Sequence, residues 1–286
     1  MIITSLAVFI RIFSNSMSNV YQKQLTNLGI CPFFINFIMY LGLSICCIPF
    51  IIGIDLVNIS TNVWLSAGFG GLCGALGNSY LVKALENGDL SVLGPINAYK
   101  SIVAMIVGIV LLKEIPSILG VLAIVLIIYG SYFIFDTLQE GFSIKLLMRK
   151  DIRYRIYALI FTAIEAVFIK NVIVQSDVTI SFVFWSFFGM LFTGIIVLFR
   201  NKVSFEKNVF VLSRFLFVII LMGIMQLSTN FVFSRINVSY ALALFQLSAI
   251  LSVILGWRFF GETKISKKLL GSIIMVVGAV ILILFN

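Results

Sequence analysis

Three charged residues fall near the middle of long apolar runs, where a side chain cannot easily reach water. They are Arg11, Lys100 and Glu165. A charge at that depth is costly, so we expect each of the three to face a cavity or a partner. Two cations against one anion leave a positive surplus, which favours a substrate that carries a carboxylate or a phosphate. The alternative is an internal salt bridge from Glu165 to Lys100 or Arg11 that only holds helices together.

Polar residues accompany both cations at helical spacing, which indicates an inward face. One stripe at i, i+4, i+7 and i+11 consists of Arg11, Asn15, Ser18 and Gln22. A similar stripe consists of Asn97, Lys100 and Ala104. One turn earlier, Pro95 leaves the carbonyl of Ser91 without its helical partner, so a kink is expected there. Glu165 is also a candidate for carrying a coupling ion such as H⁺.

Uncharged polar and aromatic residues inside the apolar runs are further candidates for contact with a substrate. They are Asn36, Tyr40, Asn78, Tyr99, Trp185, Gln226, Asn230 and Gln246. For any one of them, hydrogen bonding between helices explains the residue at least as well as contact with a ligand. The rings of Tyr40 and Trp185 suit stacking on a substrate ring and simple space-filling equally.

The composition places these residues in a membrane protein. The chain is 61% hydrophobic and 11% charged, whereas soluble domains carry about 25% charged residues. Polar breaks separate ten apolar runs, each long enough to cross the hydrocarbon core as a helix. The predicted spans are 2–23, 33–54, 63–82, 91–112, 117–135, 154–174, 179–199, 209–233, 238–257 and 268–285. The predicted fold class is therefore an all-α integral membrane protein with ten transmembrane helices.

The residue types that catalysis or metal binding would need are missing or scattered. Histidine is absent, which excludes His-ligated metals and His-dependent catalytic triads. The four cysteines form no C-x-x-C pair, and the carboxylates stand singly or nearly so near the span ends. We therefore predict no cofactor, no metal site and no catalytic residue. Lys and Arg lie in short loops between apolar runs, so the net charge of +9 requires no nucleic-acid partner.

The chain contains a tandem duplication. Gly108-Ile-Val-Leu-Leu-Lys-Glu114 returns as Gly256-Trp-Arg-Phe-Phe-Gly-Glu262, an offset of 148 residues (256 minus 108). Val20 to Lys23 returns as Val167 to Lys170 at an offset of 147 (167 minus 20), and Asn78 matches Gln226 at 148. We expect a first repeat over 1–135, a basic linker over 136–153 and a second repeat over 154–286. Because five spans per repeat is an odd number, the second repeat must enter the membrane upside down, which makes the repeats inverted.

The distribution of Lys and Arg predicts the orientation. They concentrate in the linker and in the loops that follow odd-numbered spans, whereas the loops after even-numbered spans hold only Lys113, Lys170 and Arg235. By the positive-inside rule, the odd loops lie in the cytoplasm and both termini lie outside. We expect a multi-pass protein of the plasma or inner membrane that contacts the lipid bilayer as a monomer or a homodimer.

The two five-span halves and the recurring segment resemble the drug/metabolite transporter superfamily, in particular its ten-helix EamA-type members. In each half the segment precedes a fifth span that carries glycines, Gly120 to Gly130 and Gly271-x6-Gly278. The resemblance covers nearly the whole chain. It implies an inverted-repeat fold with a central cavity lined by the first four helices of each half, and alternating-access transport or export of small metabolites. A basic residue in the fourth helix, such as Lys100, is similar to what anionic-substrate branches use.

The leading hypothesis is a secondary-active transporter or exporter of a small polar metabolite, anionic or zwitterionic, with Lys100 and Arg11 as its charge partners. The alternative is a flippase for a lipid-linked sugar or an exporter of lipophilic amines or drugs, and the amine version would use Glu165. A membrane-embedded lipid-modifying enzyme is less well supported, because that chemistry usually needs clustered carboxylates. A non-catalytic accessory subunit would leave the midplane charges without a purpose.

Overall fold

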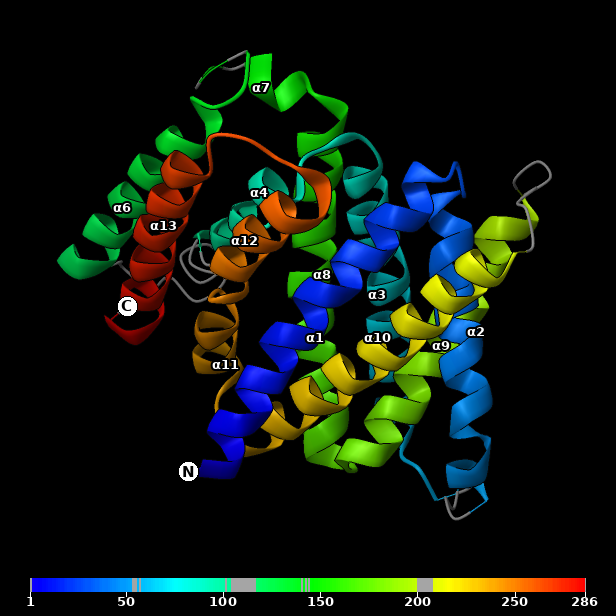
Figure 1. The fold of residues 1–286 in the computed structure, drawn as a ribbon. Coiled ribbons are helices and arrows are strands. Elements are labelled where there is room, and N and C mark those ends of the chain that lie inside the picture. Colours follow the sequence, from blue (N-terminus) through cyan, green and yellow to red (C-terminus); the bar gives the residue numbers. More distant parts are fainter. Residues whose placement is uncertain are drawn as a thin grey trace.

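The chain folds into a bundle of helices (Figure 1). The computed structural model describes residues 2–52, 56, 58–100, 102–103, 117–139, 141, 143, 145–199 and 208–285, and every regular element within these ranges is a helix. The first half contains α1 (Ile2–Asn27), α2 (Pro32–Ile51), α3 (Thr61–Asn87), α4 (Leu90–Leu93), the 3₁₀ helix η1 (Pro95–Ala98) and α6 (Ile118–Phe135). After the short α7 (Lys145–Met148), the second half contains α8 (Lys150–Gln175), α9 (Val178–Leu198), α10 (Val209–Arg235), α11 (Val238–Phe245), α12 (Ser248–Phe260) and α13 (Ile265–Phe285).

The lengths and hydropathy of these helices identify a multi-pass membrane protein. Seven spans among the described residues are long and apolar enough to cross a membrane. The helices α1 and α3, of 26 and 27 residues, are also long enough to cross a membrane, but their polar residues lower their mean hydropathy. Residues 104–112 at the end of the predicted span 91–112 lie outside the described residues, as does the segment from Gly108 to Glu114. The sequence thus predicted the all-helical membrane fold correctly.

Polar residues and one proline determine where several helices begin. The side chains that accept hydrogen bonds from backbone N–H groups in the first turns of α3, α6, α9 and α10 are Ser60, Ser117, Asp177 and Asn208. Pro32 begins α2, because the first helical position needs no N–H donor. These caps satisfy donors that the helix itself leaves without partners.

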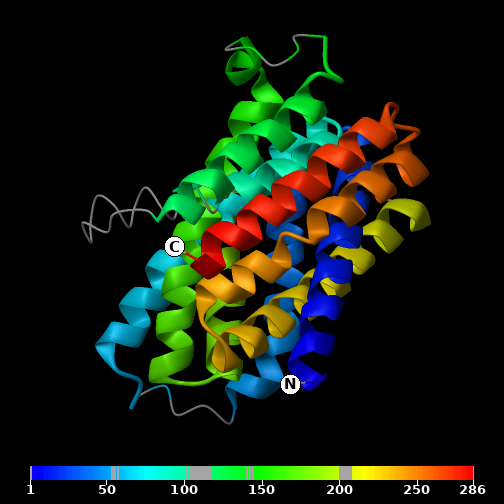
Figure 2. The same ribbon diagram turned by 90° about the vertical axis from the view of Figure 1, so that its left-hand side faces the viewer.

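The principal helix contacts join one half of the chain to the other. Helix α1 packs against α10, and α3 packs against α8. Exchanging equivalent helices of the two halves (α1 with α8, α3 with α10) converts the first contact into the second, which is the pairing expected of a pseudo-twofold arrangement. The pairs α2 with α9 and α6 with α13 map onto themselves under the same exchange. Figure 2 shows α6 and α13 side by side at one edge of the bundle.

The fourth helical segment of each half is interrupted. In the first half, α4 ends at Leu93 and η1 begins at Pro95, which confirms the expected kink. In the second half the sequence predicted one continuous span over 238–257, but α11 ends at Phe245 and α12 begins at Ser248. There Gln246 N donates to Ala243 O and Ala249 N donates to Gln246 O, so the chain tightens into i to i−3 bonds. Broken helices of this kind border the substrate sites of many inverted-repeat transporters.

Glycines allow α6 and α13 to approach backbone to backbone. A Cβ atom added at Gly271 would lie 2.5 Å from the carbonyl oxygen of Gly130, and one added at Gly130 would lie 2.7 Å from that of Gly271. A Cβ at Gly278 would lie 2.8 Å from the carbonyl oxygen of Ala123. The glycines of the fifth spans therefore act in packing between the halves.

Replacing Gly271 by valine is expected to push α13 away from α6 and to destabilise the protein by about 1–3 kcal/mol, the usual range for overpacking. The measurement is the melting temperature of the purified protein in detergent. Leu270→Val is the matched control, because the Leu270 side chain is 48% exposed on the outer surface of the same helix. Equal melting temperatures for the two variants would show that this contact is not tightly packed.

Candidate functional site

A polar cavity lies between the two halves of the bundle. It has a volume of about 100 Å³, which accommodates several water molecules because each needs roughly 10–15 Å³. Its walls come from α1, α3, η1, α8, α10, α11 and α12 and from the residues beside these helices. The charged and polar side chains of the lining are Arg11, Asn15, Asn19, Asn78, Asn97, Lys100, Arg155, Thr162, Glu165, Gln226, Thr229, Ser248 and Ser252.

Lys100 lies just beyond η1 with its ammonium group tethered to α8. The Nζ atom donates to the carbonyl oxygen of Thr162 at 2.9 Å and to its Oγ1 at 3.2 Å. Lys100 is 8% exposed, and an ammonium has three N–H donors. Two neutral oxygens thus hold the cation at the cavity wall without neutralising it.

Arg11 approaches the same cavity from α1. Its guanidinium lies 4.0 Å from the centroid of the Phe245 ring, a cation–π contact between the two halves. The Nε and Nη1 atoms are buried and have no hydrogen-bond partner among the described residues. Buried guanidinium donors without acceptors are costly, so Arg11 presents donors that an anion could satisfy in the cavity it lines.

Arg155 is a third cation in the cavity wall, and it lies at the start of the predicted span 154–174. Its Nε donates to the carbonyl oxygen of Leu93 at 2.8 Å, and Nη2 donates to Oδ1 of Asn97 at 3.0 Å. The Leu93 carbonyl is available because Asn97 N bonds to Gly94 O in the 3₁₀ turn instead. Arg155 therefore provides a hydrogen-bond donor for the carbonyl group that the break in the helix leaves free, and it orients the Asn97 amide at the cavity. Its spacing of seven residues from Thr162 and ten from Glu165, both of which line the cavity, was the signal that could have identified it.

Glu165 is the only carboxylate among the described residues that line the cavity. It is 7% exposed, and its Oε1 accepts a hydrogen bond from Trp185 Nε1 at 2.6 Å. Gly74 leaves room for it, since a Cβ atom there would lie 2.2 Å from Oε1. The salt bridge from Glu165 to Lys100 or Arg11, the alternative considered from the sequence, is not formed among the described residues. The described part of the wall thus carries three cations and one carboxylate, with no ion pair between them.

Some of the uncharged candidates line the cavity and others support it from behind. Asn15, Asn78, Asn97 and Gln226 are in the lining. Gln246 is outside the lining but contacts it, because its Oε1 accepts a hydrogen bond from Nδ2 of the lining residue Asn97 at 3.0 Å. Asn230 is buried and its Oδ1 accepts from Gln226 Nε2 at 2.9 Å. These contacts fix the orientation of amides that face the cavity.

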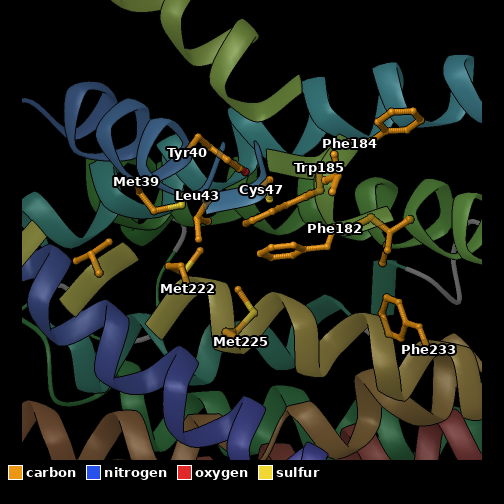
Figure 3. Packing of buried hydrophobic residues seen from close by; sticks show 14 of the residues in the cluster. Met39, Tyr40, Leu43, Cys47, Phe182, Phe184, Trp185, Met222, Met225 and Phe233 are labelled. Atoms are coloured by element: carbon orange, nitrogen blue, oxygen red, sulfur yellow. The ribbon is translucent and has the colours of Figure 1, made fainter. Parts of the chain in front are cut away.

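Tyr40 and Trp185 belong to the buried apolar cluster between α2, α9 and α10 (Figure 3). Their rings meet edge to face at 4.8 Å. The Tyr40 hydroxyl accepts a hydrogen bond from Asn78 Nδ2 at 2.9 Å, and Trp185 donates to Glu165. Neither ring lines the cavity. The structure therefore places both aromatic residues behind the wall, where they hold Asn78 and Glu165.

Two further candidates lie away from the cavity. Asn36 is fully buried, and its Nδ2 donates to Ser79 Oγ at 2.9 Å, which links α2 to α3. Tyr99 donates its hydroxyl to Ser131 Oγ on α6 at 2.8 Å. Both residues make the interhelical hydrogen bonds that the sequence offered as the alternative. The charged and polar cavity residues that the sequence did not single out are Asn19, Arg155, Thr162, Thr229, Ser248 and Ser252.

Comparison with known proteins adds four findings. The EamA-like transporter family matches residues 2–136 and 152–284. A protein of Streptococcus pyogenes serotype M1 named "Putative sugar uptake protein" is 26% identical over 246 residues, which are 79% of this chain and 80% of that protein. "Putative sugar uptake protein YxfA" of Lactococcus lactis is 25% identical over 264 residues, 85% of this chain and 87% of that protein. One solved crystal structure superposes with a TM-score of 0.66 over 97% of this chain and 96% of its own, at 14% identity, a likeness of fold alone.

Proposed function

Because the chain belongs to the EamA-like transporter family, we propose that it is a secondary-active transporter of a small polar metabolite, anionic or zwitterionic, that works by alternating access in the cell membrane. The family match supports transport across a membrane. The sequence repeat and the pairing of helices across the two halves support a substrate site between the halves. The proposal goes beyond both in assigning a substrate charge and an energy source.

The proposed charge of the substrate rests on one observation: cationic side chains outnumber carboxylates around the cavity. Arg11, Lys100 and Arg155 line it together with a single carboxylate, Glu165, among the described residues. Arg11 keeps two buried N–H positions without acceptors. A carboxylate or phosphate of the substrate would supply acceptors and offset the surplus positive charge, and guanidinium groups bind both in bidentate geometry.

The neutral part of the substrate is best matched by a hydroxylated molecule. The amides of Asn15, Asn19 and Asn78 offer both donors and acceptors to the cavity, as hydroxyl groups require. Two relatives are named for sugar uptake. A sugar that carries an acidic group would satisfy the amides and the cations together, so we propose acidic sugars as the first class to test.

Glu165 is the residue proposed to carry a coupling proton. It is buried in the cavity wall, accepts one hydrogen bond from Trp185 and has no basic partner within salt-bridge distance among the described residues. A carboxylate in that setting can gain and lose a proton without breaking an ion pair. An exporter of lipophilic amines would also use this residue, as the binding group for the substrate cation.

A thermal-shift screen of the purified protein tests the proposed substrate class. Acidic sugars, amino acids, neutral sugars and lipophilic amines are compared, because a ligand that binds the folded state raises the melting temperature by mass action. Acidic sugars or other anions should stabilise the parent protein and should stabilise Lys100→Ala much less. Stabilisation by amines alone would favour the amine exporter and contradict the proposed charge of the substrate.

A further inference from the structure

A second group of buried charges lies outside the cavity, around the start of α4. Glu262 follows α12 and is 7% exposed. Its Oε1 accepts from the backbone N–H of Leu90 at 2.7 Å, and its Oε2 accepts from that of Ser91 at 2.8 Å. A residue of the second half therefore caps the beginning of the fourth helical segment of the first half. The carboxylate thereby satisfies two N–H groups that the first turn of a helix leaves without partners.

Two lysines complete this group. Lys23, at the end of α1, donates its Nζ to Glu262 Oε1 at 3.1 Å and to the carbonyl oxygen of Gly88 at 2.7 Å. Lys268, on α13, is 2% exposed and donates to Ser91 Oγ at 2.8 Å. We refer to Lys23, Glu262 and Lys268, with the backbone of residues 88–91, as the α4 clamp.

The recurring glycine-to-glutamate segment has a direct role in the clamp. A Cβ atom at Gly256 would lie 2.4 Å from Glu262 Oε2 and 3.0 Å from Ser91 N, so only glycine leaves room for the carboxylate beside α4. Gly261 ends α12 with a φ of 64°, a left-handed conformation that reverses the chain and returns Glu262 toward α4. The corresponding residue of the first half, Glu114, lies outside the described residues.

The clamp lies at one end of the cavity. Asn15 and Asn19 line the cavity from α1, and Lys23 is one turn further along the same helical face. Gly94, directly after α4, and Ser252 of α12 line the cavity, and a Cβ atom at Gly94 would lie only 2.5 Å from Ser252 Cβ. Figure 1 shows α4 and α12 together near the end of the bundle that carries α7. All parts of the clamp thus belong to the face that the basic residues assign to the cytoplasm.

We propose that the α4 clamp is the closed gate at this end of the cavity, and that Glu262 must leave the start of α4 before substrate can pass. The inference rests on the proposed function, because only alternating access requires such a contact to break. Glu262 and Lys268 belong to the second half, whereas α4 and Lys23 belong to the first. Any movement that separates the two halves at this end must therefore break buried, charge-assisted hydrogen bonds, which are the stronger kind.

Cysteine labelling tests the gate without knowledge of the substrate. The four native cysteines are replaced by serine, and Ser252→Cys supplies a reporter thiol where α12 packs against Gly94. A thiol reagent that does not cross membranes is then applied to inside-out and right-side-out vesicles. Glu262→Gln should accelerate labelling about tenfold from one face only, the change expected from losing charge-assisted bonds, and that face identifies the side of the clamp.

Three further variants make the test specific. Lys23→Gln leaves the hydrogen bonds from Leu90 N and Ser91 N to Glu262 intact, so it should accelerate labelling less than Glu262→Gln. If Glu262→Gln does not fold, Lys23→Gln takes its place in the test. Glu86→Gln is the matched control, because Glu86 forms a partly exposed ion pair with Lys83 at the same end. The double variant Lys23→Glu with Glu262→Lys should still be labelled rapidly, because a lysine at position 262 cannot accept hydrogen bonds from the backbone N–H groups of Leu90 and Ser91.

The outcomes separate the gate from the proposed substrate. Labelling of folded Glu262→Gln and Lys23→Gln at the rate of Glu86→Gln would overturn the gate, as would slow labelling of the reversed pair. Accelerated labelling in a protein that binds no anion would retain the gate and reject the proposed substrate class. Size-exclusion profiles of each variant establish that the compared proteins are folded.

Discussion

A Lys100→Gln variant is expected to bind an anionic substrate roughly 100-fold more weakly than the parent protein, the scale of losing one partner of a buried charge pair. Glutamine keeps a neutral N–H donor at the position from which Lys100 Nζ now contacts the carbonyl oxygen of Thr162 at 2.9 Å. The substitution therefore removes the charge and keeps a polar side chain in the cavity wall. The measurement is the dissociation constant of the anion that stabilises the parent protein best.

Lys83→Gln is the control for this prediction. Lys83 forms a partly exposed ion pair with Glu86 at 2.8 Å, outside the cavity lining. Such surface pairs contribute about 0–1 kcal/mol to stability, so Lys83→Gln should leave both the melting temperature and the dissociation constant nearly unchanged. If Lys100→Gln also bound the anion with parental affinity, Lys100 would be a structural residue that only joins the fourth segment to α8.

A Glu165→Gln variant is expected to lose uptake driven by a proton gradient while it retains binding of the anion. Glutamine matches the shape of glutamate and can still accept from Trp185 Nε1, which lies 2.6 Å from Glu165 Oε1, but it cannot gain or lose a proton. Its affinity for an anion should equal or exceed that of the parent, because the negative charge next to the substrate is gone. The measurement compares gradient-driven uptake with binding in the same preparation.

The same variant distinguishes the two substrate charges. If the protein exported lipophilic amines, Glu165→Gln would abolish binding of the amine and Lys100→Gln would leave it unchanged or strengthen it. Gradient-driven uptake by Glu165→Gln at the parental rate would reject the proposed role of Glu165 in proton coupling. Glu86→Gln is again the control for a carboxylate outside the cavity.

The parts of the architecture that the sequence predicted are those set by length, hydropathy and repetition. Apolar runs of membrane-spanning length and the recurring segment led to an arrangement of two repeats, which the pairing of α1 with α10 and α3 with α8 fits. Pro95 predicted the break between α4 and η1 because proline removes a donor from the backbone. The positions of Arg11, Lys100 and Glu165 in the middle of apolar runs predicted that each faces a cavity or a partner, and all three line one cavity.

The parts that the sequence did not predict depend on contacts between distant segments. Arg155 is near the start of α8, where a basic residue ordinarily reports topology, and its role appears only when Leu93 and Asn97 lie beside it. The break at Gln246 could not be predicted in this way, because no proline lies near it in the sequence. Tyr40 and Trp185 have residue types that suit a ligand, yet both point into the apolar cluster, because Asn78 and Glu165 provide partners for their polar atoms.

Substrate exchange in liposomes tests the central claim most directly. Purified protein is reconstituted with an unlabelled compound inside, and the exchange of the same labelled compound from outside is measured for an acidic sugar, a neutral sugar and a lipophilic amine. We predict that the parent protein exchanges the acidic sugar fastest, that Lys100→Gln loses this exchange and that Glu165→Gln retains it. Exchange of only the neutral sugar or the amine, or equal exchange of the acidic sugar by Lys100→Gln, would contradict the assignment of this cavity to an anion.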